Sequence, residues 1–388
     1  MNLLIQDAGR YYRQHFGEPD FIVRSPGRIN LIGEHTDYNG GFVLPAAIDN
    51  AAYVSIGKRA DTKIALYSVD YLEYFEIEQT DIQKTQVHWA NYVLSVVVTL
   101  QKAGYSFSGF NAVVRGDIPI GAGLSSSAAV ECAVIFALNE LFVLGLDKMQ
   151  MVKLAQQAEN EFIGVKCGIM DQFASMFGKQ DQVIQLDCRS LEYNYFQFQP
   201  EDYQLLLVNT KVKHSLADSE YNLRRLDCEA GVAHLNRIFP EVNSLRDATE
   251  AMVESELKEL SNDVYNHCLY AVQEIKRVQE ACSDLMNENY AAFGKKMFET
   301  HKGLSEMYQV SCPELDFLVA FAAKHKDVLG ARMMGGGFGG CTINLIRKEG
   351  VSDFIDRASE TYLETFGILP GAYPVTISEG TSLVQAQF

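Results

Sequence analysis

The sequence lacks the cysteine and histidine spacings that mark disulfide frameworks and structural metal sites. Its eight cysteines are scattered over 388 residues, the closest pair being Cys268 and Cys282, and no C-x-x-C string occurs. Disulfide-rich folds and zinc sites both need short, regular cysteine spacings. We therefore expect free thiols and a chain that works in a reducing cytoplasm.

Long hydrophobic runs are also missing. The most apolar short stretch, residues 93–100, is far shorter than the ~20 apolar residues that cross a bilayer. The amino terminus, Met-Asn-Leu-Leu-Ile-Gln-Asp-Ala, has no basic start followed by an apolar core. We expect neither a signal peptide nor a transmembrane helix.

Positive charge is scarce. Lysine and arginine number 33 against 50 aspartates and glutamates, which gives a net charge of −17. Such a mean field repels phosphate polymers, so we expect no nucleic-acid partner and no anionic membrane partner. The hydrophobic fraction of 47% and the charged fraction of 21% are typical of a soluble globular chain.

The length and the hydrophobic pattern indicate two domains. A chain of 388 residues is too long for one ordinary domain of ~150 residues. Short strand patterns alternate with helical ones, such as residues 126–144 and 151–162, until the polar stretch 187–202. After it the pattern is mainly helical to residue 325, and strand patterns then return. We predict an α/β domain over residues 1–195 and an α+β domain over residues 196–388.

A glycine- and serine-rich loop precedes the helix expected at residue 126. Residues 119–129 read P-I-G-A-G-L-S-S-S-A-A and follow the strand pattern at 112–114. Two glycines let backbone N–H groups converge, serines add hydroxyls, and a helix N-terminus attracts negative charge. This context predicts an anion site. The alternative is a turn of small residues with one serine capping the helix.

Familiar nucleotide motifs are absent elsewhere. No Walker string of Gly-x4-Gly-Lys-Ser/Thr occurs, and the nearest approach, residues 335–342, has Cys341 in place of the lysine. Residues 335–340 also match G-x-G-x-x-G, but a strand pattern follows where a dinucleotide fingerprint opens a helix. Protein-kinase strings are missing as well. We expect a loop between strands that lets another backbone or a ligand approach closely.

Residues 25–41 concentrate charged side chains among glycines and a proline. Arg28, Glu34, His35 and Asp37 lie within ten residues. Carboxylates accept hydrogen bonds and imidazole can accept or donate, so such a group can bind several hydroxyls of one sugar. A solvated charged loop is the alternative.

Glu159 falls on the apolar face of the helix expected at 151–162, whereas Glu161 falls off it. An inward carboxylate needs a cation or hydrogen-bond donors. Magnesium held by this carboxylate, the Ser127 hydroxyl and nucleotide phosphates would satisfy it. A buried glutamate bonded to backbone N–H groups is the alternative.

Asp171 opens a short helical pattern whose apolar residues are Met170, Phe173, Met176 and Phe177. A helix-capping aspartate is one interpretation. The other is a carboxylate that accepts the proton of an attacking hydroxyl, with Arg28 steering the transferred charge.

Together these strings resemble galactokinases, within the family of small-molecule kinases that also holds homoserine, mevalonate and phosphomevalonate kinases. Residues 27–38 look like the galactokinase signature, 121–127 like the nucleotide loop of the wider family, and 332–341 like its third motif. The likeness spans nearly the whole chain. The Glu-His-Thr-Asp-Tyr stretch at 34–38 is what separates galactokinases from the other branches.

The resemblance implies a fold and a set of roles. The fold would be an N-terminal domain like the second domain of ribosomal protein S5 and a C-terminal ferredoxin-like domain, with the active site in the cleft. Asp171 would be the base and Arg28 would stabilise charge. The sugar would be bound by Glu34, His35, Thr36, Asp37 and Tyr221. Mg²⁺ would be held by Ser127 and Glu159, and ATP by Ser68, Gly121, Ala122, Gly123, Leu124, Ser125, Ser126 and Ser127.

The implied reaction is transfer of the γ-phosphoryl group of MgATP to the anomeric hydroxyl of α-D-galactose. One alternative is an N-acetylgalactosamine kinase, whose branch tends to carry cysteine where this chain has Asn39. The other is a non-catalytic galactose sensor, marked by loss of the Ser-Ala pair that Ser127 and Ala128 preserve here. Galactose and ATP are the expected partners of a cytoplasmic monomer.

Overall fold

The computed structural model describes residues 3–119, 121–213 and 217–384. Up to residue 197 its elements are α1 (Leu3–Phe16), β1 (Phe21–Asn30), η1 (Asp37–Asn39), β2 (Phe42–Val43), β3 (Pro45–Lys58), β4 (Lys63–Ser68), β5 (Glu73–Glu78), η2 (Gln79–Asp81), α2 (His88–Lys102), β6 (Phe110–Gly116), α3 (Ser126–Phe142), α4 (Lys148–Ala158), the π-helix η3 (Glu159–Ile163), α5 (Met170–Phe177), β7 (Gln182–Asp187) and β8 (Tyr193–Gln197).

The later elements are mainly helical before strands return. They are β9 (Tyr203–Lys213), α6 (Ala217–Ile238), α7 (Glu250–Glu256), α8 (Asn262–Met286), α9 (Tyr290–Glu306), α10 (Pro313–Lys324), β10 (Val328–Met333), β11 (Gly339–Arg347), η4 (Lys348–Gly350), α11 (Val351–Phe366), β12 (Gly371–Val375) and β13 (Ser382–Leu383).

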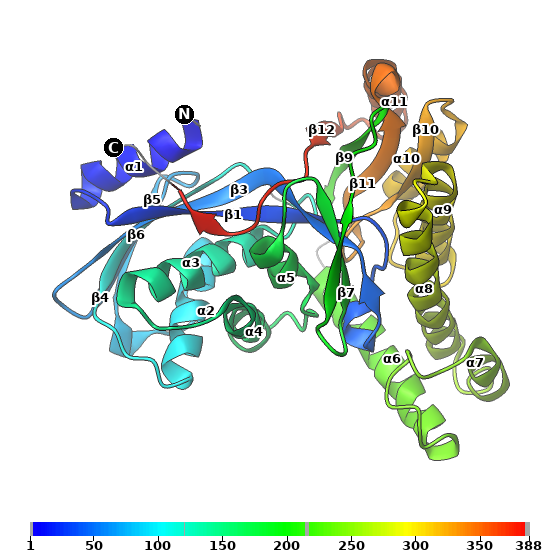
Figure 1. The fold of residues 1–388 in the computed structure, drawn as a ribbon, viewed down its shortest axis with the longest axis horizontal. Coiled ribbons are helices and arrows are strands. Elements are labelled where there is room, and N and C mark those ends of the chain that lie inside the picture. The colour runs from blue at the N-terminus through cyan, green and yellow to red at the C-terminus, as the bar shows by residue number, and fades with distance from the viewer. Residues whose placement is uncertain (1–2, 120, 214–216, 385–388) are drawn as a thin grey trace.

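The first layer is a six-stranded sheet in the order β13-β1-β3-β6-β4-β5, in which only the β4–β6 pairing is parallel. Helices α2 to α5 cover one face and α1 lies on the other (Figure 1). Helix α3 is buried on several sides because its sequence is rich in alanine and aliphatic residues, which let it pack against β1, β3 and three neighbouring helices. The sheet and its helices form an α/β layer.

The second layer is an antiparallel sheet in the order β10-β11-β9-β12. Helices α9 and α10 pack on it, and α11 lies beside them at the right of Figure 1. A small sheet, β2-β7-β8, stands between the two layers. One hydrophobic cluster joins the layers, because it holds Ile29 and Leu124 from the first half with Leu207, Val278 and Met334 from the second.

The elements agree with the sequence pattern in type and order. The fold class is confirmed, with an α/β layer followed by an α+β layer. The helix predicted at 151–162 is α4, which begins earlier and widens into a π-helix at Glu159. Residues 377–383 return to the first sheet, where Ile377 pairs with Ile48 and β13 with β1. The boundary at residue 195 stays a prediction.

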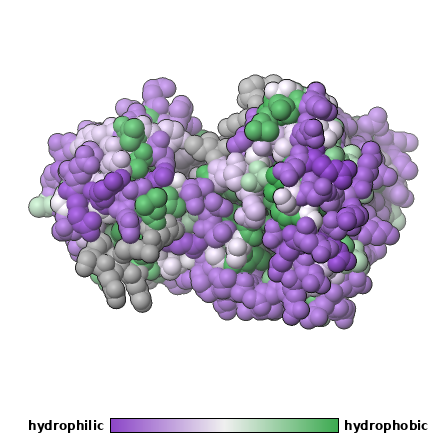
Figure 2. All heavy atoms as spheres, turned by 90° about the horizontal axis from the view of Figure 1, so that it is seen from above, coloured by the Kyte–Doolittle hydropathy of each residue, from purple (hydrophilic) through white to green (hydrophobic). Residues whose placement is uncertain are grey.

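The surface is mostly hydrophilic. Seen from above, hydrophobic side chains appear in small separate patches, and the outline narrows between two lobes (Figure 2). Within the three described ranges, no helix combines the length and apolar character needed to cross a membrane. All eight cysteines are free thiols, as the spacing predicted.

Candidate active site

A cavity of about 340 Å³ lies between the two layers and is lined from both. The sequence-predicted residues that line it are Arg28, Glu34, His35, Asp37, Gly121, Gly123, Ser125, Ser127, Glu159, Asp171 and Tyr221. Segments that are far apart in the sequence therefore meet at one place. Its size suits a small ligand, and the charged and hydroxyl side chains in its mixed polar and apolar lining can bind polar groups.

Asp171 lies in the first turn of α5 but does not cap that helix. Residue 169 takes the capping position without a side-chain cap. Instead, Arg28 Nε donates to Asp171 Oδ1 at 2.8 Å, and Ser125 Oγ donates to Oδ2 at 2.5 Å. The capping interpretation of Asp171 is thereby replaced by a carboxylate held in place at the cavity wall.

Arg28 ties this carboxylate to the glycine loop. The arginine is 4% exposed, and its Nη1 donates to the carbonyl of Gly123 at 2.6 Å. Burial by itself would lower the pKa of the guanidinium, but the charges of Asp171 and Glu34 raise it. Arg28 is therefore a fixed positive charge beside Asp171.

The glycine loop bends through left-handed conformations before α3 begins. Gly123 has φ 73° and Ser125 has φ 55°, which is uncommon for a residue with a side chain. A side chain at Gly123 would lie 3.2 Å from the carbonyl oxygen of Met334, because the loop packs against the third motif. Ser125 precedes α3 without capping it through its side chain. Residue 120 of this string lies outside the described residues.

Glu159 faces inward, as the helical pattern predicted, at the point where α4 becomes a π-helix. Its carboxylate accepts hydrogen bonds from Ser127 Oγ at 2.8 Å and from Gln172 Nε2 at 2.7 Å. Glu161 is exposed and pairs with Lys102 at 3.0 Å. Burial, followed by the charge of Asp171, raises the pKa of Glu159. Side chains, and not the backbone N–H groups of the alternative, are its partners.

The Ser127–Glu159 pair fits a magnesium ion. Both offer hard oxygen atoms, which Mg²⁺ prefers, and because burial raises the pKa of Glu159, a cation beside it would favour its charged form. Across the described ranges, no group of three or more His, Cys, Asp or Glu side chains forms a metal site. The remaining ligands would come from nucleotide phosphates and water, as is usual for this ion.

The sugar-signature residues approach from the turn after β1. His35 has φ 64°, and its Nδ1 lies 2.7 Å from the hydroxyl of Tyr38, which lies 2.8 Å from the hydroxyl of Tyr308. Burial, with a smaller effect of Arg224, lowers the pKa of His35 to about 3, so its imidazole is neutral. Burial and the charge of Asp171 raise the pKa of Asp37 to about 7.

Five predicted residues do not line the cavity: Thr36, Ser68, Ala122, Leu124 and Ser126. Thr36 is fully buried, and its hydroxyl donates to the carbonyls of Gly33 and Phe42 at 2.9 and 2.6 Å. It therefore holds the turn that presents its neighbours. Ser68 ends β4, and its hydroxyl accepts a hydrogen bond from the N–H of Tyr71 at 3.3 Å.

The sequence patterns did not indicate two residues that contact the predicted site residues. Tyr308 contacts the ring of His35 at 4.7 Å between centroids, and Gln172 bridges to Glu159. Gln172 could have been found, since it follows Asp171 directly in the chain. No sequence pattern around Tyr308 could have indicated its role, because the chain must fold before Tyr308 contacts Tyr38.

Three family models match the chain. Residues 10–58 match the galactokinase galactose-binding signature, 91–179 the GHMP kinases N-terminal domain, and 279–363 the GHMP kinases C-terminal family. They cover the sugar signature, the glycine loop with Asp171, and the third motif. The family assignments therefore fall on the segments that build the cavity.

Similar proteins carry the same family name over their full lengths. A galactokinase of Clostridium acetobutylicum is 41% identical over 99% of both chains, and one of Thermotoga maritima is 39% identical over 93% of this chain and 99% of its own. The crystal structure of Lactococcus lactis galactokinase complexed with galactose has a TM-score of 0.92 and 34% identity, covering 96% of this chain and 98% of that one. A mevalonate kinase at 18% identity and TM-score 0.64 shares the fold. The chain belongs to the galactokinases, a family of ATP-dependent sugar kinases within the GHMP kinases.

Proposed function

We propose that the protein transfers the γ-phosphoryl group of MgATP to the C1 hydroxyl of α-D-galactose, giving galactose 1-phosphate and ADP. The observation that carries this proposal is the shared cavity. Sugar-type hydrogen-bonding residues, the Arg28–Asp171 pair and the glycine loop all line it. The galactokinases that the chain resembles, one of them crystallised with galactose, support the choice of sugar.

The sugar is bound by the wall that the galactokinase signature forms. Glu34, Asp37, His35 and Tyr221 offer acceptors and donors to its hydroxyls. Neutral His35 can act in either sense, because its ring is not protonated at neutral pH. Thr36 contributes by fixing the turn, since its hydroxyl is already used by two carbonyls.

The nucleotide phosphates are received by the backbone N–H groups of residues 121–127 and the N-terminus of α3. Ser127 and Glu159 would hold Mg²⁺, which neutralises phosphate charge when it is bound. Adenine or its ribose would lie toward Ser68. Because the net charge of the chain is −17, these local groups supply the attraction for ATP.

In the reaction, the sugar O1 forms a bond to the γ-phosphorus while the bond from that phosphorus to the ADP oxygen breaks. The proton of the hydroxyl passes to Asp171, whose carboxylate is oriented by Arg28 and Ser125. Phosphoryl transfer has a loose transition state, so positioning and charge stabilisation do most of the catalytic work. Arg28 supplies a positive charge that stays in place throughout.

An ADP-release assay with MgATP tests the proposal. We expect turnover with galactose and little with N-acetylgalactosamine, glucose or homoserine. Turnover with N-acetylgalactosamine in preference to galactose would assign the protein to the N-acetylgalactosamine kinases. Galactose binding without any ADP release would indicate a non-catalytic galactose sensor. The proposal also includes a cytoplasmic location and a monomeric state. Sedimentation at working concentration would check the monomeric state.

A further inference from the structure

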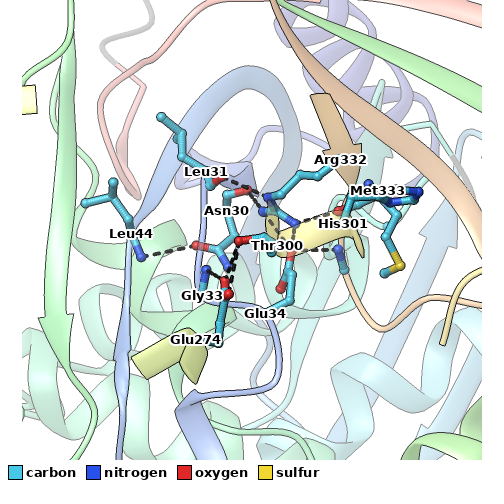
Figure 3. Close-up of polar contacts among 12 residues, drawn as sticks. Asn30, Leu31, Gly33, Glu34, Leu44, Glu274, Thr300, His301, Arg332 and Met333 are labelled. Atoms are coloured by element: carbon cyan, nitrogen blue, oxygen red, sulfur yellow. Dashed lines mark hydrogen bonds and ion pairs between the residues drawn. The ribbon is translucent and has the colours of Figure 1, made fainter. Parts of the chain in front are cut away.

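The carboxylate of Glu34 is held by an arginine from the second layer (Figure 3). Arg332 lies on β10 and is 0% exposed. Its Nη1 and Nη2 each lie 3.1 Å from Glu34 Oε1, and the N–H of Gly335 donates to the same oxygen at 2.8 Å. Three donors thus converge on Oε1. The other oxygen, Oε2, is the one left for a ligand in the cavity that Glu34 lines.

The same guanidinium fastens the chain that leads to Glu34. Its Nε donates to the carbonyl of Leu31 at 2.8 Å, and its Nη2 donates to the carbonyl of Asn30. Its Nη1 also donates to the carbonyl of Met333 at 2.5 Å. A planar fork of donors can meet all these acceptors at once, whereas a lysine ammonium has three donors from one nitrogen.

A second buried side chain holds the neighbouring peptide. Glu274 on α8 is 0% exposed and accepts a hydrogen bond from the N–H of Gly33 at 3.0 Å. Thr300 on α9 donates to the same carboxylate at 3.0 Å. Gly33 has φ +97°, and a side chain there would lie 2.8 Å from the carbonyl oxygen of Phe42. Glu274 therefore fixes the peptide N–H of Gly33, one residue before Glu34, and Arg332 fixes the Glu34 side chain.

We infer that Arg332 is a positioning residue of the sugar site, which fixes Glu34 so that Oε2 faces a hydroxyl of the bound sugar. This inference rests on the proposed function. Arg332 is fully buried and does not line the cavity, so it acts on the sugar only through Glu34. Its main effect is on sugar binding, because neither the Arg28–Asp171 nor the Ser127–Glu159 hydrogen bond involves Arg332 or Glu34, although the charge of Glu34 also raises the pKa of Arg28.

A double-mutant cycle tests the inference with the full chain. Arg332→Lys, Glu34→Gln and the double variant are compared with wild type for kcat and for the KM values of galactose and ATP. We expect each single change to raise the galactose KM by about tenfold or more, with kcat and the ATP KM changed by less than about threefold. The galactose KM of the double variant should be no higher than that of the single variant with the higher KM. The reason is that both changes remove the same Arg332–Glu34 interaction.

Arg24→Lys is the matched control. Arg24 also donates to carbonyls of distant segments, those of Ile48, Asp49 and Glu379, but it lies away from the cavity. This control should lower the melting temperature without raising the galactose KM. The inference would be overturned if the increases in galactose KM caused by Arg332→Lys and Glu34→Gln multiplied in the double variant. A rise in the ATP KM equal to the rise in the galactose KM would also overturn it.

A crystal structure of the wild-type protein with galactose decides the matter if Arg332→Lys does not fold. The expected result is Glu34 Oε1 on Arg332 and Gly335, with Oε2 on a sugar hydroxyl. A Glu34 side chain turned away from Arg332, or a sugar contact made by Oε1, would refute the role. Failure of the wild-type protein to phosphorylate galactose would instead refute the proposed function, and this is visible before any variant is made.

Discussion

Arg28 and Asp171 form a 2.8 Å ion pair that joins the end of β1 to the first turn of α5. The arginine is nearly buried, while the aspartate side chain is 22% exposed and reaches the cavity. A carboxylate fixed in this way can accept a proton without first reorienting.

Asp171→Asn should lower kcat by ~10²–10⁴, the usual contribution of a proton-transfer group, while galactose affinity changes little. The amide is nearly the same size but cannot take the proton. Rates of ADP release and calorimetric galactose titration would measure the two effects. Asp7→Asn, which changes a surface ion pair on α1, is the matched control. A wild-type kcat in the Asp171→Asn variant would rule out the assignment.

Ser127→Ala and Glu159→Gln should each raise the free Mg²⁺ concentration needed for half-maximal rate. We expect a change of about tenfold or more, since even outer partners of a bound metal contribute that much. The measurement is the rate at fixed ATP over a range of free Mg²⁺. Ser126→Ala is the control, because this neighbouring serine does not line the cavity. An unchanged Mg²⁺ requirement in both site variants would remove the metal role.

Asp37 should make stability depend on pH. Its folded pKa of about 7 lies above the unfolded value of 3.8, so the folded state holds this proton more tightly. Below about pH 4 the carboxyl is protonated in both states and does not change the free energy of unfolding. Between about pH 4 and pH 7 it lowers that free energy increasingly, and above about pH 7 the decrease stays constant. Asp37→Asn should stabilise the protein at pH 8 but not at pH 4, as melting temperatures would show. A gain that does not depend on pH would contradict the raised pKa.

Galactose use should follow the same ionisation. A carboxylate accepts hydrogen bonds more strongly than a carboxylic acid. We therefore expect kcat/KM for galactose to rise with pH through about 7, the pKa of Asp37, while neutral His35 adds no step in this range. Initial rates between pH 5.5 and 8.5 test this, and a flat profile would show that Asp37 is not the titrating group.

Tyr308→Phe should weaken sugar binding without removing catalysis. The phenol is fully buried and joins the Tyr38 hydroxyl at 2.8 Å and the Cys228 thiol at 3.4 Å. Its loss should raise the galactose KM several-fold and lower the free energy of unfolding by ~1 kcal/mol. Tyr362→Phe is the control, because this buried phenol bonds a carbonyl outside the site. An unchanged KM would limit Tyr308 to packing.

Local sequence patterns were enough to predict many of the residues that line the cavity. Glycines and serines before a helix indicated the anion loop, and helical periodicity placed Glu159 inward and Glu161 outward. Those inferences need only a few neighbouring residues. The contact of Arg332 with Glu34 spans 298 positions, and no spacing rule reaches so far. The same applies to Tyr308, whose role depends on how α6, α8 and α9 pack together.

The pairing of β13 with β1 has a consequence for biosynthesis. The partner of Arg24 in the sheet is Ser382, so this edge of β1 stays open while the whole intervening chain leaves the ribosome. An open strand edge is a template for wrong pairing. The nascent protein must therefore keep the edge of β1 from pairing elsewhere until residues 382–383 emerge, and shielding by a chaperone would matter most during that interval.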